Sequence, residues 1–226
     1  MSGPVMLVHM LLERLSRREL PRIPEPDLVM DTPEQIEAFA ACGREGGVLA
    51  PIYFFNALHA ANTIRPGGTV LDLACGPCNQ LSQIARLHPR SRFIGVDASA
   101  NMLALGEDYL DHCAIHNVRL EEGDICTLDM LADASIDSVT CTLSLHHLPD
   151  TNALMQAMRA VKRVLKPGGG IYLSDFGRLK RAATQHYFAH DRQDCQPPQF
   201  TVDFLNSMRA AFSVDELGAG HRATRR

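Results

Sequence analysis

The pattern of hydrophobic and polar positions changes near residue 66. Before it, the spacing is helical. Residues 5–20 carry leucines on one helical face, and the prolines of "PRIPEP" end that segment. "DTPEQIEAFAACG" predicts a second helix, with Thr32 as N-cap, Pro33 as first residue and Gln35 closing a capping box. "PIYFFNALHAANTI" predicts a third helix, ended by "RPGG".

After Gly68, short β-branched runs alternate with helical stretches. Their order is "TVLDL", a helix from Asn79 to Leu87, "RFIGV", a helix from Ser99 to about Cys113, "VRLEE", "IDSVTCTL", a helix from Thr151 to Leu165, the turn "KPGGG" and "GIYLSDF". This alternation predicts parallel strands joined by right-handed crossovers. The fold class is therefore α/β, a doubly wound, mostly parallel sheet with an N-terminal helical cap. Ligands of such sheets bind beyond the carboxyl ends of the strands.

The same change of pattern divides the chain into three regions. Residues 1–65 form an N-terminal helical cap and substrate region, residues 66–176 an α/β core, and residues 177–226 a helical lid and C-terminal segment. Aromatic residues of the two outer regions either roof a pocket or form the cores of two helical caps. The first group is Tyr53, Phe54 and Phe55, and the second includes Tyr187, Phe188 and Phe200.

Composition excludes several classes of function. The 226 residues are 46% hydrophobic and 21% charged, as expected for one well-buried core. The net charge of −4 and the lack of a basic stripe argue against DNA as a partner. Only 6% of residues are aromatic, which argues against base-stacking surfaces. Seven cysteines without a disulfide framework indicate a reducing, cytoplasmic protein. We expect neither a signal peptide nor a membrane span.

Carboxylates stand at the ends of three successive predicted strands, at Asp72, Asp97 and Asp124. For any one of these carboxylates, capping of the next helix is as good an explanation as ligand binding. Three of them at the mouth of one sheet favour a ligand. A dinucleotide is not that ligand, because Cys78 and Leu81 replace the second and third glycines of the G-x-G-x-x-G fingerprint. An acid just before the loop would repel a pyrophosphate and attract a cationic ligand.

Five segments in order, "VLDLACGPC", "FIGVDAS", "LEEGDIC", "SVTCTLSLHHLPD" and "RVLKPGGGIYLSDF", resemble class I S-adenosylmethionine-dependent methyltransferases of the small-molecule type. The resemblance covers roughly residues 66–176. It implies a Rossmann-like sheet, S-adenosylmethionine as cofactor and S-adenosylhomocysteine as product, and it makes residues 66–176 the cofactor-binding core. Sheets of this family usually carry seven strands, and the sequence lacks a β-rich run for the last two.

The resemblance also implies residue roles. Asp72 and Gly76 match the acidic, glycine-rich loop at the methionine end, Asp97 the acceptor of both ribose hydroxyls, and Asp124 the acceptor of the adenine amino group. The full implied cofactor set is Asp72, Ala74, Gly76, Asp97, Ala98, Met102, Asp124, Ile125 and Leu143. Cys78 departs from the family, whose loop usually has a glycine there. A side chain at this position is expected to crowd the ligand and weaken binding.

Methyl transfer from a sulfonium is an in-line displacement, so the protein mainly has to align the nucleophile. His147 and His146 are the candidate catalytic bases, because an imidazole titrates near neutral pH. The alternative is that "HHLP" only turns the chain. The loop of amino-methylating nucleic-acid enzymes and the Pro-Cys of cytosine-C5 enzymes are absent. No metal site is predicted, because Cys75-x-x-Cys78 lacks a second ligand pair.

Three functional hypotheses therefore stay open. The first is a methyltransferase acting on a small molecule. The second is a catalytically weak or inactive binding or regulatory protein with the same fold, and the third is a protein or RNA methyltransferase whose N-terminal helices dock a macromolecule. The last predicted strand, "GIYLSDF", leaves an open sheet edge. Because proteins normally cover such edges, we expect a homodimer, or shielding by residues 1–65.

Overall fold

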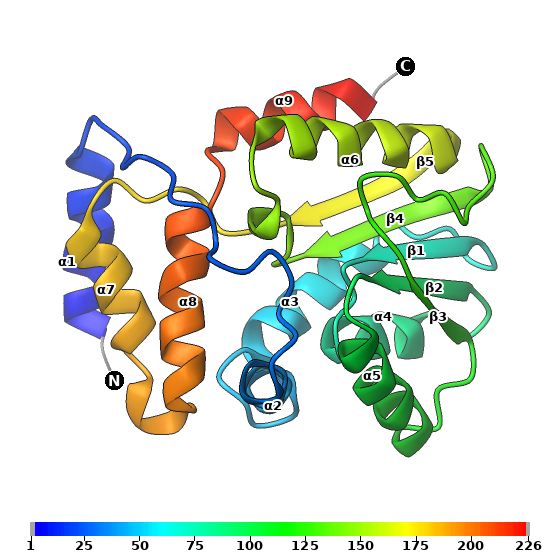
Figure 1. Ribbon diagram of the computed structural model, residues 1–226, viewed down its shortest axis with the longest axis horizontal. Coiled ribbons are helices and arrows are strands. Elements are labelled where there is room, and N and C mark those ends of the chain that lie inside the picture. The colour runs from blue at the N-terminus through cyan, green and yellow to red at the C-terminus, as the bar shows by residue number, and fades with distance from the viewer. Residues whose placement is uncertain (1–2, 225–226) are drawn as a thin grey trace.

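The computed structural model describes residues 3–224 (Figure 1). Three helices come first: α1 (Gly3–Leu15), α2 (Pro33–Gly43) and α3 (Ala50–Ala61). Strands and helices then alternate in the order β1 (Thr69–Leu73), α4 (Asn79–Leu87), β2 (Arg92–Asp97), α5 (Ala100–His112), β3 (Val118–Glu122), β4 (Ile136–Thr142), the 3₁₀ turn η1 (Leu145–His147), α6 (Thr151–Val164) and β5 (Leu165–Ser174). The last elements are α7 (Ala182–His190), η2 (Gln193–Cys195), α8 (Pro198–Ala210) and α9 (Val214–Thr224).

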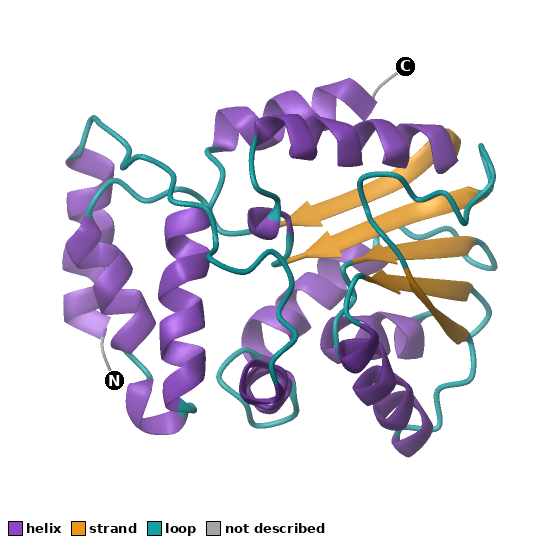
Figure 2. Cartoon of the chain, viewed as in Figure 1, coloured by secondary structure: helices purple, strands orange, loops and turns teal. Residues whose placement is uncertain are grey.

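The five strands form one parallel sheet in the order β3-β2-β1-β4-β5. Helices cover both of its faces (Figure 2). On one face, α3 packs beside α4 and contacts β5, α4 packs on β2, and α5 packs on β2 and β3. On the other face, α6 and α9 pack together against the core of β1, β4 and β5. The predicted α/β class is confirmed. The strand order reverses between β1 and β4, which is where such sheets bind ligands.

Strand β1 lies at the centre of the sheet and is buried on both faces. Leu71 and Leu73 belong to the core under α6, and Val70 belongs to the core under α3 and α4. A strand buried on both sides reads as a continuous apolar run. Asp72 interrupts this run and is 3% exposed. A carboxylate in such a place needs a partner or a function.

The first helix is shorter than predicted, because α1 ends at Leu15 rather than at residue 20. The reason is tertiary. The Leu20 N–H donates to the Leu179 carbonyl, and the Ile23 N–H donates to the Arg209 carbonyl. These bonds hold the following chain extended as it runs from α1 past α8 to α2 (Figure 1). We call residues 22–31 the strap.

Strand β5 is longer than predicted, since the expected turn "KPGGG" lies within it. Leu165 already pairs with Ile136, and a register shift follows before Ser138 pairs with Gly170. Gly168 adopts a φ of 71° inside the irregularity. Only glycine does this without steric cost, so the glycines form a bulge instead of ending the strand.

The outer edge of β5 has no strand partner among residues 3–224. Four of the outer helices pack together beside the sheet: α2 and α7 both pack on α8, and the ring of His9 on α1 stacks on Tyr187 of α7 with ring centroids 4.3 Å apart. The division at residues 65 and 176 stays a prediction. Within the described residues, no helix has the length and apolarity needed to cross a membrane.

Candidate active site

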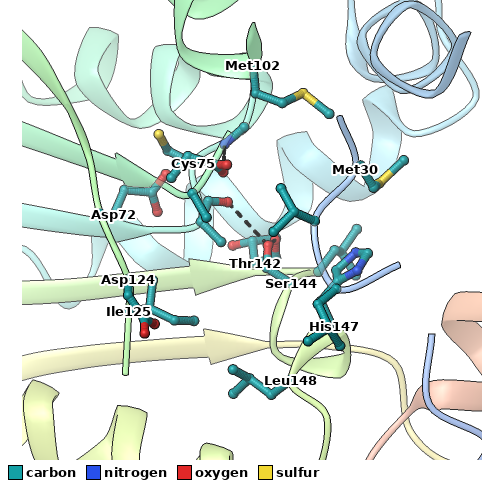
Figure 3. A pocket seen from close by; sticks show the side chains of 18 of the residues that line it. Met30, Asp72, Cys75, Met102, Asp124, Ile125, Thr142, Ser144, His147 and Leu148 are labelled. Atoms are coloured by element: carbon teal, nitrogen blue, oxygen red, sulfur yellow. Dashed lines mark hydrogen bonds between the residues drawn. The ribbon is translucent and has the colours of Figure 1, made fainter. Parts of the chain in front are cut away.

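A cavity of about 590 Å³ lies at the carboxyl ends of β1, β2 and β4 (Figure 3). This is a common size for a small-molecule site. All nine residues predicted to bind the cofactor line it: Asp72, Ala74, Gly76, Asp97, Ala98, Met102, Asp124, Ile125 and Leu143. The structure thus brings together residues that are up to 71 positions apart in the sequence.

The loop after β1 has an unusual backbone. Ala74, Gly76 and Cys78 have φ values of 49°, 51° and 61°, all in the left-handed region. Alternating conformations of this kind turn successive backbone N–H groups toward one side of a loop. The loop is fixed to β2 because the Asp97 carboxylate accepts the Gly76 N–H at 2.8 Å. The shape of the loop therefore depends on a side chain from the next strand.

Asp97 is held at the end of β2 by both of its oxygens. Oδ2 accepts from Gly76, and Oδ1 accepts the Ser99 N–H at 2.9 Å. Burial raises the pKa of Asp97, whereas the bonds from backbone N–H groups oppose that shift. An ionised carboxylate has about four acceptor positions, and the backbone N–H groups of Gly76, Ser99 and Ala98 occupy no more than three of them. The carboxylate is therefore oriented in advance and can still accept from a ligand.

Asp72 is the most deeply buried of the three carboxylates. Its Oδ1 accepts the Thr140 hydroxyl at 2.6 Å. Burial raises the pKa of Asp72 to about 7, and the nearby Asp97 charge adds to the shift, while the bond from Thr140 opposes it. A cation in the cavity would stabilise the ionised form of Asp72.

Asp124 is the most exposed of the three carboxylates. Its Oδ1 accepts the Cys126 N–H at 2.7 Å, which closes a short turn after β3. Ile125 stands beside it in the cavity wall, and Figure 3 shows both on the same side of the cavity as Asp72. The three carboxylates predicted from the strand ends thus surround one cavity.

Buried polar atoms without partners test whether a polar ligand fits this cavity. Both side-chain polar atoms of Gln80 and the Thr142 hydroxyl are buried in the cavity wall, and within residues 3–224 they have no hydrogen-bond partner. Leaving such atoms unpaired costs about 1–3 kcal/mol each. A ligand with donors and acceptors at this end would satisfy them. The residues present therefore fit a ligand such as S-adenosylmethionine.

Several wall residues were missed by sequence reasoning. Gln80 lies just outside the motif segments, and Thr142 lies inside "SVTCTLSLHHLPD" without having been given a role. Leu28, Val29 and Met30 reach the wall only because the strap crosses the cavity mouth. Among the aromatic residues weighed from the sequence, Tyr53 lines the cavity and Phe200 is core, whereas Phe54 and Phe55 are 62% and 54% exposed.

Cys78 does not crowd the cavity. Its thiol is fully buried in the core under α4 and α5, where it faces Gly106, and it is not part of the cavity wall. The loop keeps its left-handed residue at this position, and the side chain points away from the ligand. The expected crowding therefore does not arise.

We expect Cys78→Gly to leave the affinity for S-adenosylhomocysteine within about threefold of wild type, because the deleted thiol contacts only the core. Removing the left-handed strain and losing a buried side chain have opposite effects on stability. Isothermal titration calorimetry measures the affinity. A tenfold gain would show that the thiol does obstruct the ligand. Gly106→Ala is the contrasting variant, because its methyl group would lie 2.8 Å from the Cys78 sulfur.

The two histidines of η1 differ in position. His147 lines the large cavity, whereas His146 is 2% exposed and lies behind it, with Nδ1 2.7 Å from Asp175 Oδ1. Burial lowers the pKa of His147 to about 3, and the neighbouring His146 lowers it further. His147 is therefore neutral at physiological pH.

Comparison with known proteins agrees with this geometry. A family model described as "Methyltransferase domain" matches residues 64–205. The chain belongs to the class I S-adenosylmethionine-dependent methyltransferase family. The match begins just before β1, includes the whole sheet and ends within α8.

Relatives and solved structures of methyltransferases extend the comparison. Demethylmenaquinone methyltransferase from Listeria welshimeri is 35% identical over 113 residues, which cover 50% of this chain and 46% of that protein. The YcgJ protein from Bacillus subtilis is 25% identical, with a TM-score of 0.56 over 75% of this chain and 66% of that one. A methyltransferase from Aquifex aeolicus shares the fold at 19% identity, with a TM-score of 0.51 over 71% of this chain and 72% of that one. The chain spans about half the length of the curated relatives it matches.

Proposed function

We propose that this methyltransferase-family protein transfers a methyl group from S-adenosylmethionine to a small, mostly apolar acceptor molecule. One observation carries the proposal: a single cavity has carboxylates at one end and apolar side chains at its mouth. S-adenosylmethionine, when bound, supplies a methyl group already activated for displacement by its sulfonium. The protein then needs only to bind, orient and exclude water.

The cofactor end of the cavity is proposed to work through charge and hydrogen bonding. Asp72 and the loop after β1 face the cationic methionine end, Asp97 accepts from the ribose hydroxyls, and Asp124 accepts from the adenine amino group. Ala98, Met102 and Ile125 pack on the adenine. Support comes from the shared cavity and from the unpaired atoms of Gln80 and Thr142.

The acceptor end is proposed to lie under the strap. Leu28, Val29 and Met30 from the strap, Phe39 from α2 and Leu148 after η1 make this wall largely apolar. Apolar walls favour an acceptor with apolar surface. The demethylmenaquinone methyltransferases among the relatives are consistent with such an acceptor, although the matched segment covers only part of them.

We propose His147, rather than His146, as the histidine beside the acceptor, because only His147 lines the cavity. A base role for either residue stays a prediction. His147→Ala should leave S-adenosylhomocysteine binding intact and slow turnover of the acceptor. Calorimetry and single-turnover assays separate the two effects. If the variant turns over the acceptor at the wild-type rate, the proposed role of His147 beside the acceptor is wrong.

Cofactor affinity should rise about tenfold between pH 5.5 and 7. The pKa of Asp72 is about 7 without ligand, so its carboxyl group takes up a proton as the pH falls through this range. A cationic ligand binds the ionised form and expels that proton, so binding is tighter at the higher pH. The pKa of Asp97 is also raised, and its ionisation acts in the same direction.

Calorimetry over this pH range, in buffers with different ionisation heats, measures both affinity and proton release. Tyr53, Cys75 and Cys141 also interact with Asp72 but stay neutral, because burial raises the pKa values of Tyr53 and Cys141. The hydrogen bond with Cys78, together with burial, raises the pKa of Cys75. Asp72→Asn is the control, and its weaker binding should vary much less with pH. An affinity of the wild type that does not change with pH would contradict the role given to Asp72.

The alternative functions are separated by two measurements. Absence of binding to both S-adenosylmethionine and S-adenosylhomocysteine would favour an inactive protein with this fold. Transfer of a labelled methyl group to protein or RNA, and not to small quinone- or phenol-like acceptors, would favour a macromolecular substrate.

We also propose that a second copy of the chain covers the open edge of β5. Light scattering of the purified protein tests this, and a monomeric mass would refute it.

A further inference from the structure

Three electron-pair donors meet behind the large cavity: Glu25 of the strap and His146 and His147 of η1. One ligand atom from each lies within 4.8 Å of the other two. Nε2 of His146 is 4.0 Å from Oε1 of Glu25, and the two imidazole rings are 4.5 Å apart. The Glu25 and His146 side chains are 7% and 2% exposed. Water therefore solvates them poorly.

The hydrogen bonds of His146 determine where its proton lies. Asp175 Oδ1 is 2.7 Å from Nδ1, and Asp175 Oδ2 accepts the His146 backbone N–H at 2.9 Å. Because a carboxylate only accepts, Nδ1 carries the hydrogen. Nε2 is then the nitrogen that faces Glu25, and its distance of 4.0 Å from Oε1 is too long for a hydrogen bond.

His147 repeats this arrangement. Its ring donates to the backbone carbonyl of Asp27, while Nδ1 is buried and has no hydrogen-bond partner among the described residues. Each histidine thus has one ring nitrogen oriented by a carboxylate or a carbonyl, which leaves the other nitrogen for a bond to a ligand. This is the usual environment of a histidine that ligates a metal.

The charges around the cluster also favour a cation. The carboxylates of Asp203 and Asp27 act on Glu25 as like charges, and the Ser207 hydroxyl donates to Glu25 Oε1 at 2.8 Å. The guanidinium of Arg22 is near, but it donates to the backbone carbonyls of His146, Leu148, Pro149 and Ala210. Buried, converging acceptors of this kind are costly unless a positive group joins them.

We propose that Glu25, His146 and His147 bind a divalent first-row transition-metal ion, with Zn²⁺ the best match. Two imidazoles and one carboxylate are a common ligand set for zinc, and they leave a fourth position for water or a substrate oxygen. Tetrahedral coordination places ligand atoms ~3.3 Å apart. Small side-chain rotations would close the 4.0 Å separation between Glu25 and His146.

The ion would join two segments that are about 120 residues apart in the sequence. Glu25 belongs to the strap that crosses the cavity mouth, and the histidines belong to the turn after β4. Binding would therefore lock the strap onto the turn. The proposal departs from the sequence prediction of no metal. It also excludes a base role for the same His147 nitrogen, because the ion would occupy its lone pair.

The test uses the untagged full chain, stripped with chelator and titrated with ZnCl₂ by calorimetry. The stacked pair His186 and His190 on α7, with ring centroids 3.9 Å apart, is a competing binder. All measurements are therefore made in a His186→Gln/His190→Gln background. We expect one Zn²⁺ per chain, a higher unfolding temperature with metal and slower proteolysis within the strap. Absence of binding in this background would overturn the proposal.

Glu25→Gln should weaken Zn²⁺ binding at least tenfold and abolish the thermal shift. Asp175→Asn, which loosens His146 without removing a ligand, should weaken binding about tenfold or more. Glu19→Gln, an exposed change just before the strap, is the matched control and should bind like the background protein.

Unchanged binding by Glu25→Gln would refute the site. If that variant does not fold, Co²⁺ titration of the background protein decides: visible absorption saturating at one equivalent supports the site, and its absence refutes it. All these readouts are independent of methyl transfer.

Discussion

Asp97→Ala should reduce the affinity for S-adenosylmethionine and S-adenosylhomocysteine at least a hundredfold. The carboxylate is proposed to accept from the ribose hydroxyls, and it also holds the loop after β1 through the Gly76 N–H. Hydrogen bonds to a charged group contribute about 1.5–3 kcal/mol each. Losing two of them corresponds to roughly a hundredfold or more. Isothermal titration calorimetry measures the loss directly.

Two further variants make this result interpretable. Asp97→Asn keeps the size and one acceptor but removes the charge, so its affinity should fall between those of wild type and Asp97→Ala. Asp31→Asn is the control. Asp31 bonds to Ser99 and Asn101 close by but does not line the cavity. Asp31→Asn should bind within threefold of wild type. If Asp97→Ala also binds S-adenosylhomocysteine within threefold of wild type, Asp97 does not belong to the proposed cofactor site.

Arg22→Ala should be the most destabilising single change on the strap. The guanidinium donates to four backbone carbonyls, three of them from residues 146–149, and stacks on Phe212 at 4.1 Å. Removing it leaves those carbonyls without a charged donor, at a cost of about 3 kcal/mol. For a chain of this size that lowers the unfolding temperature by about 6–12 °C.

Thermal and urea unfolding measure this loss, and a surface arginine provides the reference. Arg18 is exposed, so Arg18→Ala should change the free energy of unfolding by no more than about 0.5 kcal/mol. Arg22→Lys keeps the charge but not the planar fork of donors, and should recover only part of the stability. Equal stability of Arg22→Ala and wild type would show that the strap is not anchored at this point.

Much of the proposed cofactor end of the site could be predicted from the sequence. Parallel strands alternating with helices bring their carboxyl ends to one edge of a sheet, so Asp72, Asp97 and Asp124 had to gather there once the strands were recognised. Local signals were equally informative. Thr32 and Gln35 form the predicted capping box, and α4 spans the predicted residues.

What the sequence left open depends on contacts between distant segments. Neither the end of α1 at Leu15 nor the path of the strap follows from periodicity, because both depend on bonds to Leu179, Arg209 and the turn after β4. Periodicity also does not show that His147 lines the cavity while His146 lies behind it. Nor does it show that Glu25 lies beside both histidines. Local hydrophobic pattern determined the sheet and its acidic rim, since these follow from neighbours along the chain. The tertiary structure alone decided which polar groups were buried together, because desolvation and hydrogen bonding depend on proximity in space.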